Sequence, residues 1–243
     1  MSSVTMKHIY KKYAGGVIAV TDFNLDIEDK EFIILVGPSG CGKSTTLRMI
    51  AGLEEISGGE LRMDGKLMNY VEPQKREIAM VFQNYALYPH MTVYGNMAYA
   101  LKIRKVPKRE IDKRVHEVAR ILEIEHLLDR RPGELSGGQR QAMALLMSTM
   151  TPIEFLILDE HTAALDPKTA ELIMELTDKI VKEKNLTTVM VTHNLRYAVE
   201  YGNRLIMMHQ GNAIIDKAGE EKAKMKVDDI LETFNRISIE CGN

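Results

Sequence analysis

A short glycine-rich segment constrains the fold more than any other part of this chain. Residues 37–45 contain the pattern G-x-x-x-x-G-K-[ST], which is typical of loops that bind nucleotide phosphates. The apolar run 32–36 before it predicts a buried strand, and residues 45–51 predict a helix. Glycine lets the backbone approach phosphate oxygens, and free amides at the helix start donate to them. The predicted phosphate loop consists of Gly37, Pro38, Ser39, Gly40, Cys41, Gly42, Lys43, Ser44 and Thr45.

Three side chains of this loop have distinct predicted roles. Lys43 is predicted to contact the β- and γ-phosphates, and the Ser44 hydroxyl to ligate Mg²⁺. Cys41 is interpreted as a small loop residue rather than a redox centre, because only one other cysteine, Cys241, exists in the sequence. The alternative for the whole segment is a chance glycine turn, which the motifs further along the chain argue against.

Composition limits the class of protein. The chain has 243 residues, 45% of them hydrophobic, which is enough for one domain with a substantial core. The net charge of −2 gives no indication of nucleic-acid binding. The sequence has no signal-peptide pattern and no apolar run of the roughly 18–20 residues that span a bilayer. We expect a soluble protein of a reducing cytosol, which leaves docking on a membrane protein open.

Alternating strand and helix patterns predict an α/β fold. Strands are expected at 4–10, 23–27, 32–36, 60–65, 78–82, 155–158, 187–192, 204–208 and 213–216. Helices are expected at 92–104, 107–124, from about 136, and at 168–184, 195–201 and 227–236. These patterns predict a mostly parallel central sheet with helices on both faces, an antiparallel β subdomain, and an inserted α-helical subdomain at about 88–152.

Two acidic residues end one of the hydrophobic strands. Residues 155–160 read Phe-Leu-Ile-Leu-Asp-Glu, and α/β proteins bind ligands at the carboxyl ends of parallel strands. With a phosphate loop upstream, Asp159 is predicted to hold Mg²⁺, directly or through water. Glu160 is predicted to position and deprotonate the attacking water. The alternative is a strand end that simply meets solvent.

A second helix start has the properties of an anion site. Residues 135–139, the signature segment, read Leu-Ser-Gly-Gly-Gln, which places a hydroxyl and free amides at a positive dipole end. If two chains associate head to tail, one nucleotide can bind the helix start after the phosphate loop of one chain and the helix start in the signature segment of the other. The alternative is an ordinary N-capped helix. The predicted phosphate contacts are Ser136, Gly137, Gly138 and Gln139.

These motifs, together with Thr192-His193, resemble the ATP-binding subunits of ATP-binding cassette (ABC) transporters over essentially the whole chain. Asp159 lies 20 residues beyond Gln139, which also fits that family. The resemblance implies a P-loop NTPase with ATP and Mg²⁺ as cofactors. It also implies an ATP-dependent homodimer, integral membrane transporter subunits as partners, no nucleic acid, and a cytoplasmic, peripheral location on the inner face of the cell membrane.

The resemblance implies further roles by position. Tyr13 resembles the aromatic residue that stacks on adenine, Gln83 the glutamine that contacts Mg²⁺ and the attacking water, and His193 the histidine that contacts the γ-phosphate. Their alternatives are a surface strand tyrosine, a plain loop glutamine and a structural histidine. Asp166 resembles the aspartate of the loop that couples the two sites of the dimer, and it also suits a helix N-cap before Pro167.

The two halves of the chain resemble different branches of this family. Residues 1 to about 139 resemble ATPases of maltose- and glycerol-phosphate-type sugar importers, most specifically in the segment 83–97. The remainder resembles small ATPases of amino-acid or aromatic-compound importers, and His161 stands where sugar importers have proline. A recombined chain with a seam near 132–142 is one hypothesis, and a natural outlier branch is the other. A C-terminal regulatory domain, usual in sugar importers, is not expected, so residues 1–243 form one predicted domain.

The predicted function is ATP binding and hydrolysis that powers solute import through ATP-driven dimer closure. The alternative is a folded chimeric or engineered ATPase domain that binds ATP without coupling to a transporter. A DNA-repair or chromosome-structure role is disfavoured, because about 90 residues without sustained heptads separate the phosphate loop from the signature segment.

Overall fold

The computed structural model describes residues 3–240, with side chains described as far as Ile237. Cys241 therefore lies outside the described residues. The chain divides into two compact units. The first unit comprises Met1–Met80, Glu154–Glu160 and Ile180–Asn243, and the second comprises Val81–Ile153 and His161–Lys179. Each unit is described by itself.

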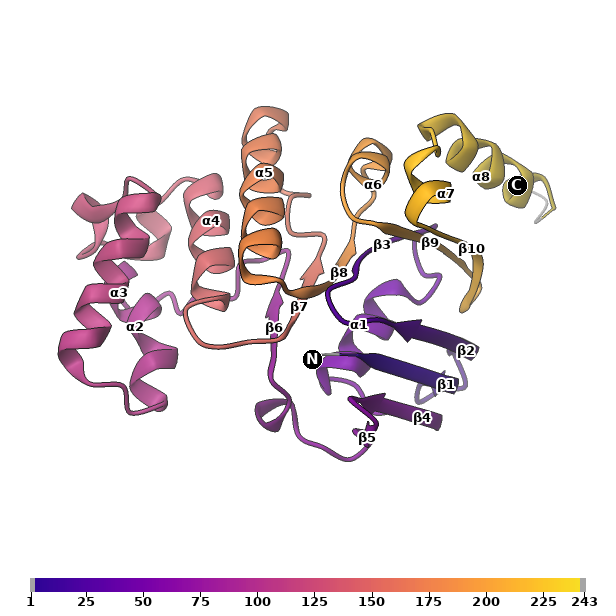
Figure 1. The fold of residues 1–243 in the computed structure, drawn as a ribbon, viewed down its shortest axis with the longest axis horizontal. Coiled ribbons are helices and arrows are strands. Elements are labelled where there is room, and N and C mark those ends of the chain that lie inside the picture. Colours follow the sequence, from indigo (N-terminus) through magenta and orange to yellow (C-terminus); the bar gives the residue numbers. More distant parts are fainter. Residues whose placement is uncertain (1–2, 241–243) are drawn as a thin grey trace. The chain divides into compact units, whose positions relative to one another are not determined.

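A six-stranded sheet with the order β10-β9-β3-β8-β7-β6 forms the centre of the first unit (Figure 1). β3 pairs in parallel with β8 and β9, and β7 pairs in parallel with β8, whereas β10 runs antiparallel to β9. Because β3 and β8 are buried along their whole length, both read as continuous apolar or threonine-containing runs. The strands are β3 (Phe32–Val36), β6 (Ile78–Val81), β7 (Phe155–Asp159), β8 (Thr187–Val191), β9 (Arg204–His209) and β10 (Asn212–Ala218).

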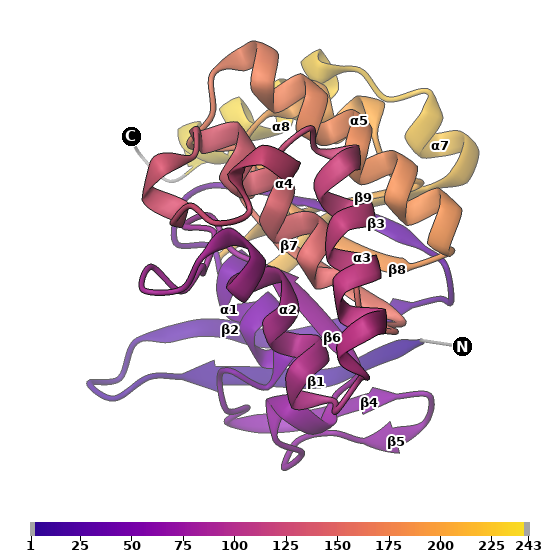
Figure 2. The ribbon, with the colours of Figure 1, turned by 90° about the vertical axis from the view of Figure 1, so that its left-hand side faces the viewer.

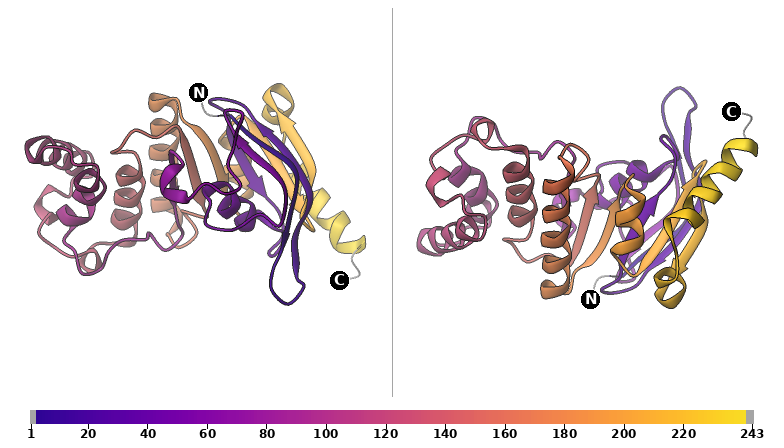
Figure 3. Two further views of the ribbon diagram at one scale, coloured as in Figure 1. Left: turned by 90° about the horizontal axis from the view of Figure 1, so that it is seen from below. Right: turned by 90° about the horizontal axis from the view of Figure 1, so that it is seen from above.

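A second, antiparallel sheet has the order β2-β1-β4-β5. Its strands are β1 (Val4–Lys12), β2 (Ile18–Ile27), β4 (Gly58–Met63) and β5 (Lys66–Leu67). β2 begins five residues earlier than the alternation at 23–27 indicates. Irregularities in the β1–β2 register and the positive φ of Asp22 (47°) interrupt the alternating pattern. Figure 3 shows the β1–β2 hairpin as a projecting indigo loop.

Helices cover both faces of the central sheet in the first unit, as the alternating pattern predicts. In Figure 1, α6 (Leu195–Glu200), α7 (Gly219–Ala223) and α8 (Val227–Glu240) lie on one side and α1 (Lys43–Ala51) on the other. α7 has only five residues, which is too short for a periodic pattern to reveal. α8 extends to Glu240 rather than 236.

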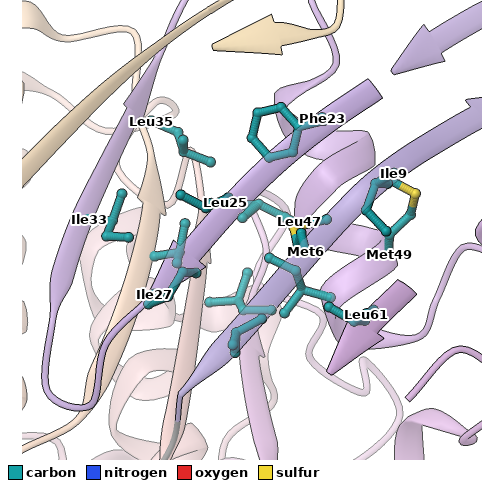
Figure 4. Packing of buried hydrophobic residues seen from close by; sticks show 14 of the residues in the cluster. Met6, Ile9, Phe23, Leu25, Ile27, Ile33, Leu35, Leu47, Met49 and Leu61 are labelled. Carbon is teal, nitrogen blue, oxygen red and sulfur yellow. The ribbon is translucent and has the colours of Figure 1, made fainter. Parts of the chain in front are cut away.

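The main core lies around α1 and the strands on either side of it (Figure 4). Leu47 and Met49 of α1 are fully buried there. This burial fixes the axis of the helix that follows the phosphate loop. The residues labelled in Figure 4 are Met6, Ile9, Phe23, Leu25, Ile27, Ile33, Leu35, Leu47, Met49 and Leu61.

The second unit is built from helices. They are α2 (Val93–Ile103), α3 (Lys108–Ile121), α4 (Gly137–Ser148) and the first part of α5 (Pro167–Lys184), with α2 beside α3 in Figure 2. Short 3₁₀ turns, Pro73–Lys75 in the first unit and Glu125–Leu127 and Pro132–Glu134 in the second, complete the described elements. α3 ends before residue 124 because Glu123 adopts a φ of 56°. None of the described helices has the length and apolarity that crossing a membrane requires.

Candidate functional site

The phosphate loop runs from the end of β3 to the start of α1, as the motif predicts. Gly42 precedes α1 with a φ of 102°, and a Cβ at this position would lie 2.6 Å from the Ala19 carbonyl oxygen of β2. Only glycine fits this conformation and this close approach. Gly42 also provides no side-chain cap. The first amides of α1 therefore have no capping side chain and can donate hydrogen bonds to a bound anion.

Lys43 is held inside the loop. Its Nζ donates to the carbonyl oxygens of Gly37 (2.8 Å) and Pro38 (2.9 Å), and the residue is 8% exposed. Cys41 is buried beside it, with Sγ 3.6 Å from Nζ, and fills space as a small residue. The ammonium thus lies within the loop, where phosphate oxygens can replace the two carbonyls as acceptors.

The two predicted metal ligands of the first unit lie in contact. Ser44 Oγ of α1 donates to Asp159 Oδ1 of β7 over 3.0 Å. Burial raises the pKa of Asp159, and the hydrogen bond from Ser44 counters that effect. A hydroxyl and a partly desolvated carboxylate are hard oxygen donors, which fit Mg²⁺. Among residues 3–240, no cluster of three or more His, Cys, Asp or Glu side chains has metal-site geometry. The remaining ligands of a cation here are expected from phosphate and water oxygens.

Glu160 and His193 lie next to each other at the carboxyl edge of the central sheet. Glu160 has a φ of 48°, and its amide donates to the Val191 carbonyl oxygen over 3.0 Å. A non-glycine residue in this region is strained, and such strain gathers at functional sites. His193 Nδ1 is 3.6 Å from Glu160 Oε2, with the imidazole 66% and the carboxylate 29% exposed. An accessible carboxylate beside an imidazole is an arrangement that can orient and deprotonate water.

Tyr13 lies beside the phosphate loop. Its hydroxyl shares a hydrogen bond of 3.3 Å with Thr45 Oγ1 in the first turn of α1, and the residue is half-buried. An aromatic ring at this distance from the phosphate loop is suitably placed to stack on the base of a nucleotide. The stacking role remains a prediction.

Ser136 caps α4 in the second unit. The Gln139 amide donates to Ser136 Oγ over 3.1 Å, and the Ser136 amide donates to Gln139 Oε1 over 2.9 Å, which makes a capping box. The N-cap interpretation is thus confirmed. The role in phosphate binding stays a prediction, and it is compatible with the cap because the serine hydroxyl still has its proton to donate.

Gly138 and Asp166 set the contact between α4 and α5. A Cβ on Gly138 would lie 2.3 Å from Thr169 Cγ2, so glycine allows the two helices to approach closely. The Thr169 amide donates to Asp166 Oδ1 over 3.1 Å, and hydrogen bonding from Thr169 lowers the pKa of Asp166. Asp166 is therefore a helix N-cap, as one of its two interpretations predicts, and its coupling role stays a prediction.

Gln83 belongs to the second unit and is exposed two residues after β6. The loop that follows contains Tyr85 (φ 65°) and Ala86 (φ 49°), two consecutive strained residues. The Arg140 guanidinium lies 5.2 Å from the Tyr85 ring centroid and donates to the Leu135 carbonyl oxygen over 2.6 Å. The segment after Gln83 is thereby tied to the signature segment within this unit.

Arg76 is a buried charge that the sequence analysis does not single out. Its guanidinium donates to the carbonyl oxygens of Val71, Met49, Ile50 and Met68, and burial lowers its pKa. Met49 and Ile50 lie in the last turn of α1, so the cation lies at the negative end of the helix dipole. A single arginine before a strand carries no local signal of this role.

His161, the departure from the sugar-importer pattern, is 2% exposed. Its Nε2 is 3.1 Å from the Thr177 hydroxyl, which itself donates to the Ile173 carbonyl oxygen. The imidazole is therefore the donor. Burial lowers the pKa of His161 to about 4, so it is neutral near pH 7 and adds no charge next to Glu160 in the chain.

Comparisons with known proteins agree with this geometry. The sequence profile described as ABC transporter matches residues 20–163. The chain is 52% identical over 211 residues to the oligosaccharides import ATP-binding protein MsmX of Bacillus subtilis, covering 87% of this chain and 58% of MsmX. The chain spans 57% to 61% of the length of the curated relatives it matches.

Two solved structures share the fold. The dimeric post-hydrolysis structure of the ATP-binding cassette MJ0796, bound to ADP and Pi, has a TM-score of 0.80 and 32% identity, covering 88% of this chain and 98% of that one. CbiO1 of Clostridium perfringens, part of the ABC transporter complex cbiONQ, has a TM-score of 0.81 and 27% identity, covering 97% and 94%. The predicted P-loop NTPase fold with an antiparallel β subdomain is confirmed.

Proposed function

This chain belongs to the ABC transporter family, and on that premise we propose that it is the ATP-hydrolysing subunit of a solute importer. The observation that carries the proposal is the 3.0 Å contact between Ser44 and Asp159, directly before Glu160. It joins the phosphate loop to the acidic strand end. Phosphate binding and the group that activates water thus belong to one edge of one sheet.

In this proposal the chemistry is divided among the predicted site residues. Lys43 and the amides that start α1 bind the phosphates, and Tyr13 stacks on adenine. Ser44, Asp159 and Gln83 hold Mg²⁺, which when bound neutralises phosphate charge. Glu160 orients the attacking water and accepts its proton, and His193 contacts the γ-phosphate.

A second copy of the chain completes the site in this proposal. Ser136, Gly137, Gly138 and Gln139 of one protomer contact the nucleotide bound in the phosphate loop of the other, and Asp166 couples the two sites. The dimeric structure of MJ0796 supports this arrangement. Because ATP then lies across the interface, ATP stabilises only the closed dimer, and hydrolysis of ATP allows the dimer to open again.

The partners are integral membrane transporter subunits, and the chain acts on the cytoplasmic face of the membrane. The place of CbiO1 in a transporter complex supports such an assembly. A carbohydrate-like solute is proposed because MsmX, at 52% identity, is named for oligosaccharide import. The helical segment at about 88–152 is part of the same ATPase domain in this proposal.

The test is the variant Glu160→Gln with MgATP, analysed by size-exclusion chromatography. Loss of the carboxylate base removes turnover but not binding, so an ATP-bound dimer should accumulate. The matched control is Glu220→Gln, whose carboxylate is 92% exposed on α7. It should behave as the wild type. A Glu160→Gln protein that binds ATP and stays monomeric would count against ATP-driven closure.

The recombination hypothesis has a separate test. Alignments of 211 to 222 residues to single relatives continue across 132–142, which gives the seam no support. Recombination predicts that residues 1–130 and 145–243, compared separately, have different nearest relatives. An uncoupled ATPase predicts steady-state hydrolysis that purified transporter subunits leave unchanged.

A further inference from the structure

Lys11 of β1 is buried where a strand lysine would normally reach solvent. Its side chain is 9% exposed, and its Nζ lies 2.6 Å from Glu54 Oε1. The same ammonium donates to the Glu55 carbonyl oxygen over 2.7 Å. Desolvating an ammonium is costly, and these two acceptors hold the charge at a fixed point.

The Lys11 ammonium lies over the Tyr13 ring. Lys11 Nζ is 4.9 Å from the ring centroid, within the range of a cation–π interaction. The Tyr13 hydroxyl is held separately by Thr45. The ring is therefore restrained through one face and through its edge.

Both restraints lead to the helix that carries the phosphate loop. Thr45 lies in the first turn of α1. Beyond the last turn, the amides of Leu53 and Glu54 donate to the Arg48 carbonyl oxygen over 2.9 Å and 3.2 Å. Glu54 is thereby joined to the end of α1, and its carboxylate forms the ion pair with Lys11. The tyrosine is thus tied to both ends of one buried helix.

We propose that Lys11 is a positioning residue for the nucleotide base, which holds one face of the Tyr13 ring and leaves the opposite face to stack on adenine. This inference rests on the proposed function, in which Tyr13 is the stacking residue. A ring restrained in advance loses less conformational freedom when the base binds. Lys11 therefore contributes to affinity for the base and not for the phosphates.

The experiment compares Lys11→Met with Lys11→Arg. Methionine keeps the apolar stem without the charge, and arginine keeps a cation that can also lie over the ring. Calorimetric titration measures the affinity for MgATP and for inorganic tripolyphosphate, which has no base. Lys11→Met should weaken MgATP binding by about threefold to twentyfold and leave tripolyphosphate binding unchanged. Lys11→Arg should restore most of the MgATP affinity.

Steady-state kinetics and a double variant separate this role from simple destabilisation. Lys11→Met should raise KM for ATP without lowering kcat. In a Tyr13→Ala background, Lys11→Met should have no further effect on MgATP affinity. Unchanged MgATP affinity in Lys11→Met, beside a loss in Tyr13→Ala, overturns the inference. Equal weakening of MgATP and tripolyphosphate overturns it as well. If Lys43→Ala leaves MgATP affinity intact, the proposed function itself fails.

Discussion

Two helix starts in this molecule are predicted to bind phosphate, and their capping differs. α1 follows Gly42, which offers no side-chain cap. α4 follows Ser136, which is satisfied by a reciprocal cap with Gln139. The amides of the first turn of α1 thus have no capping side chain, whereas one amide of α4 is already used by its own cap.

In the proposed site, this difference divides the binding of one nucleotide unequally between the two helix starts. The start of α1 has a lysine, uncapped amides and an adjacent carboxylate that fits a metal, so by itself it has the features of an anion site. The start of α4 offers a hydroxyl proton and glycine amides, and the nearby cation, Arg140, already donates to the Leu135 carbonyl oxygen. It fits a supplementary role, in which it adds contacts to a phosphate already bound elsewhere.

The largest expected effect separates the two starts at once. Lys43→Ala should remove most of the affinity for MgATP and lower turnover by about 10² to 10³-fold, because a buried charge that meets the phosphates is lost. Steady-state ATPase assays and titration with MgATP measure both quantities. Lys75→Ala, whose ammonium is 71% exposed, is the control and should match the wild type.

A change at the second start should lower turnover without changing the MgATP affinity of the monomer. Ser136→Arg should lower turnover by about 10- to 100-fold through loss of the hydroxyl donor and crowding of the dimer interface. MgATP affinity of the monomer should stay at the wild-type value, in contrast to Lys43→Ala. Ser136→Thr keeps both hydroxyl and cap and should retain activity. Undiminished turnover in Ser136→Arg would remove the shared site.

The glycines of the two starts should respond differently to one added methyl group. The added methyl group of Gly42→Ala would lie 2.6 Å from the Ala19 carbonyl oxygen. Because that oxygen belongs to the backbone, no substitution at Ala19 should rescue Gly42→Ala. Gly138→Ala meets Thr169 Cγ2 at 2.3 Å, and should cost about 1–3 kcal/mol of unfolding free energy. Thr169→Ser removes that methyl group, so it should rescue Gly138→Ala. Denaturant unfolding of the single and double variants decides the matter.

The smallest expected effect concerns a third helix start, that of α5. Hydrogen bonding from Thr169 lowers the pKa of Asp166, so this cap contributes stability above the ordinary value of 3.8 and loses it as pH falls through the lowered value. The Tm difference between wild type and Asp166→Asn should therefore shrink between pH 5 and pH 3. The serine cap of α4 has no titratable group, so the Tm difference between wild type and Ser136→Ala should not depend on pH in this range.

Local patterns predicted most of the fold. The strand, loop and helix around residues 32–51 appear as the motif requires, and the acidic strand end and the Ser136 helix start were also predicted correctly. Each of these depends on residues close together in the sequence. The start of β2 was missed because Asp22 breaks the alternation that reveals a strand.

Contacts between distant residues could not be predicted in the same way. Lys11 and Glu54, or Arg76 and the end of α1, meet only because the sheets pack around one helix. Their partners include backbone carbonyls, which leave no trace in the types of the neighbouring residues. The residues proposed to bind phosphate were accessible to sequence reasoning, whereas the residues proposed to position the site were not.

Arg76 shows how such a contact tolerates evolutionary drift. All four of its acceptors are main-chain oxygens, at Val71, Met49, Ile50 and Met68. Any residue at those four positions presents the same backbone oxygen, so this contact does not depend on their side chains, whereas core packing does constrain Met49, Ile50 and Met68. Arg76 has no such freedom, since lysine offers one charged centre where the guanidinium forks to several. In homologous sequences, the arginine should therefore be kept more strictly than the side chains of its four acceptor residues.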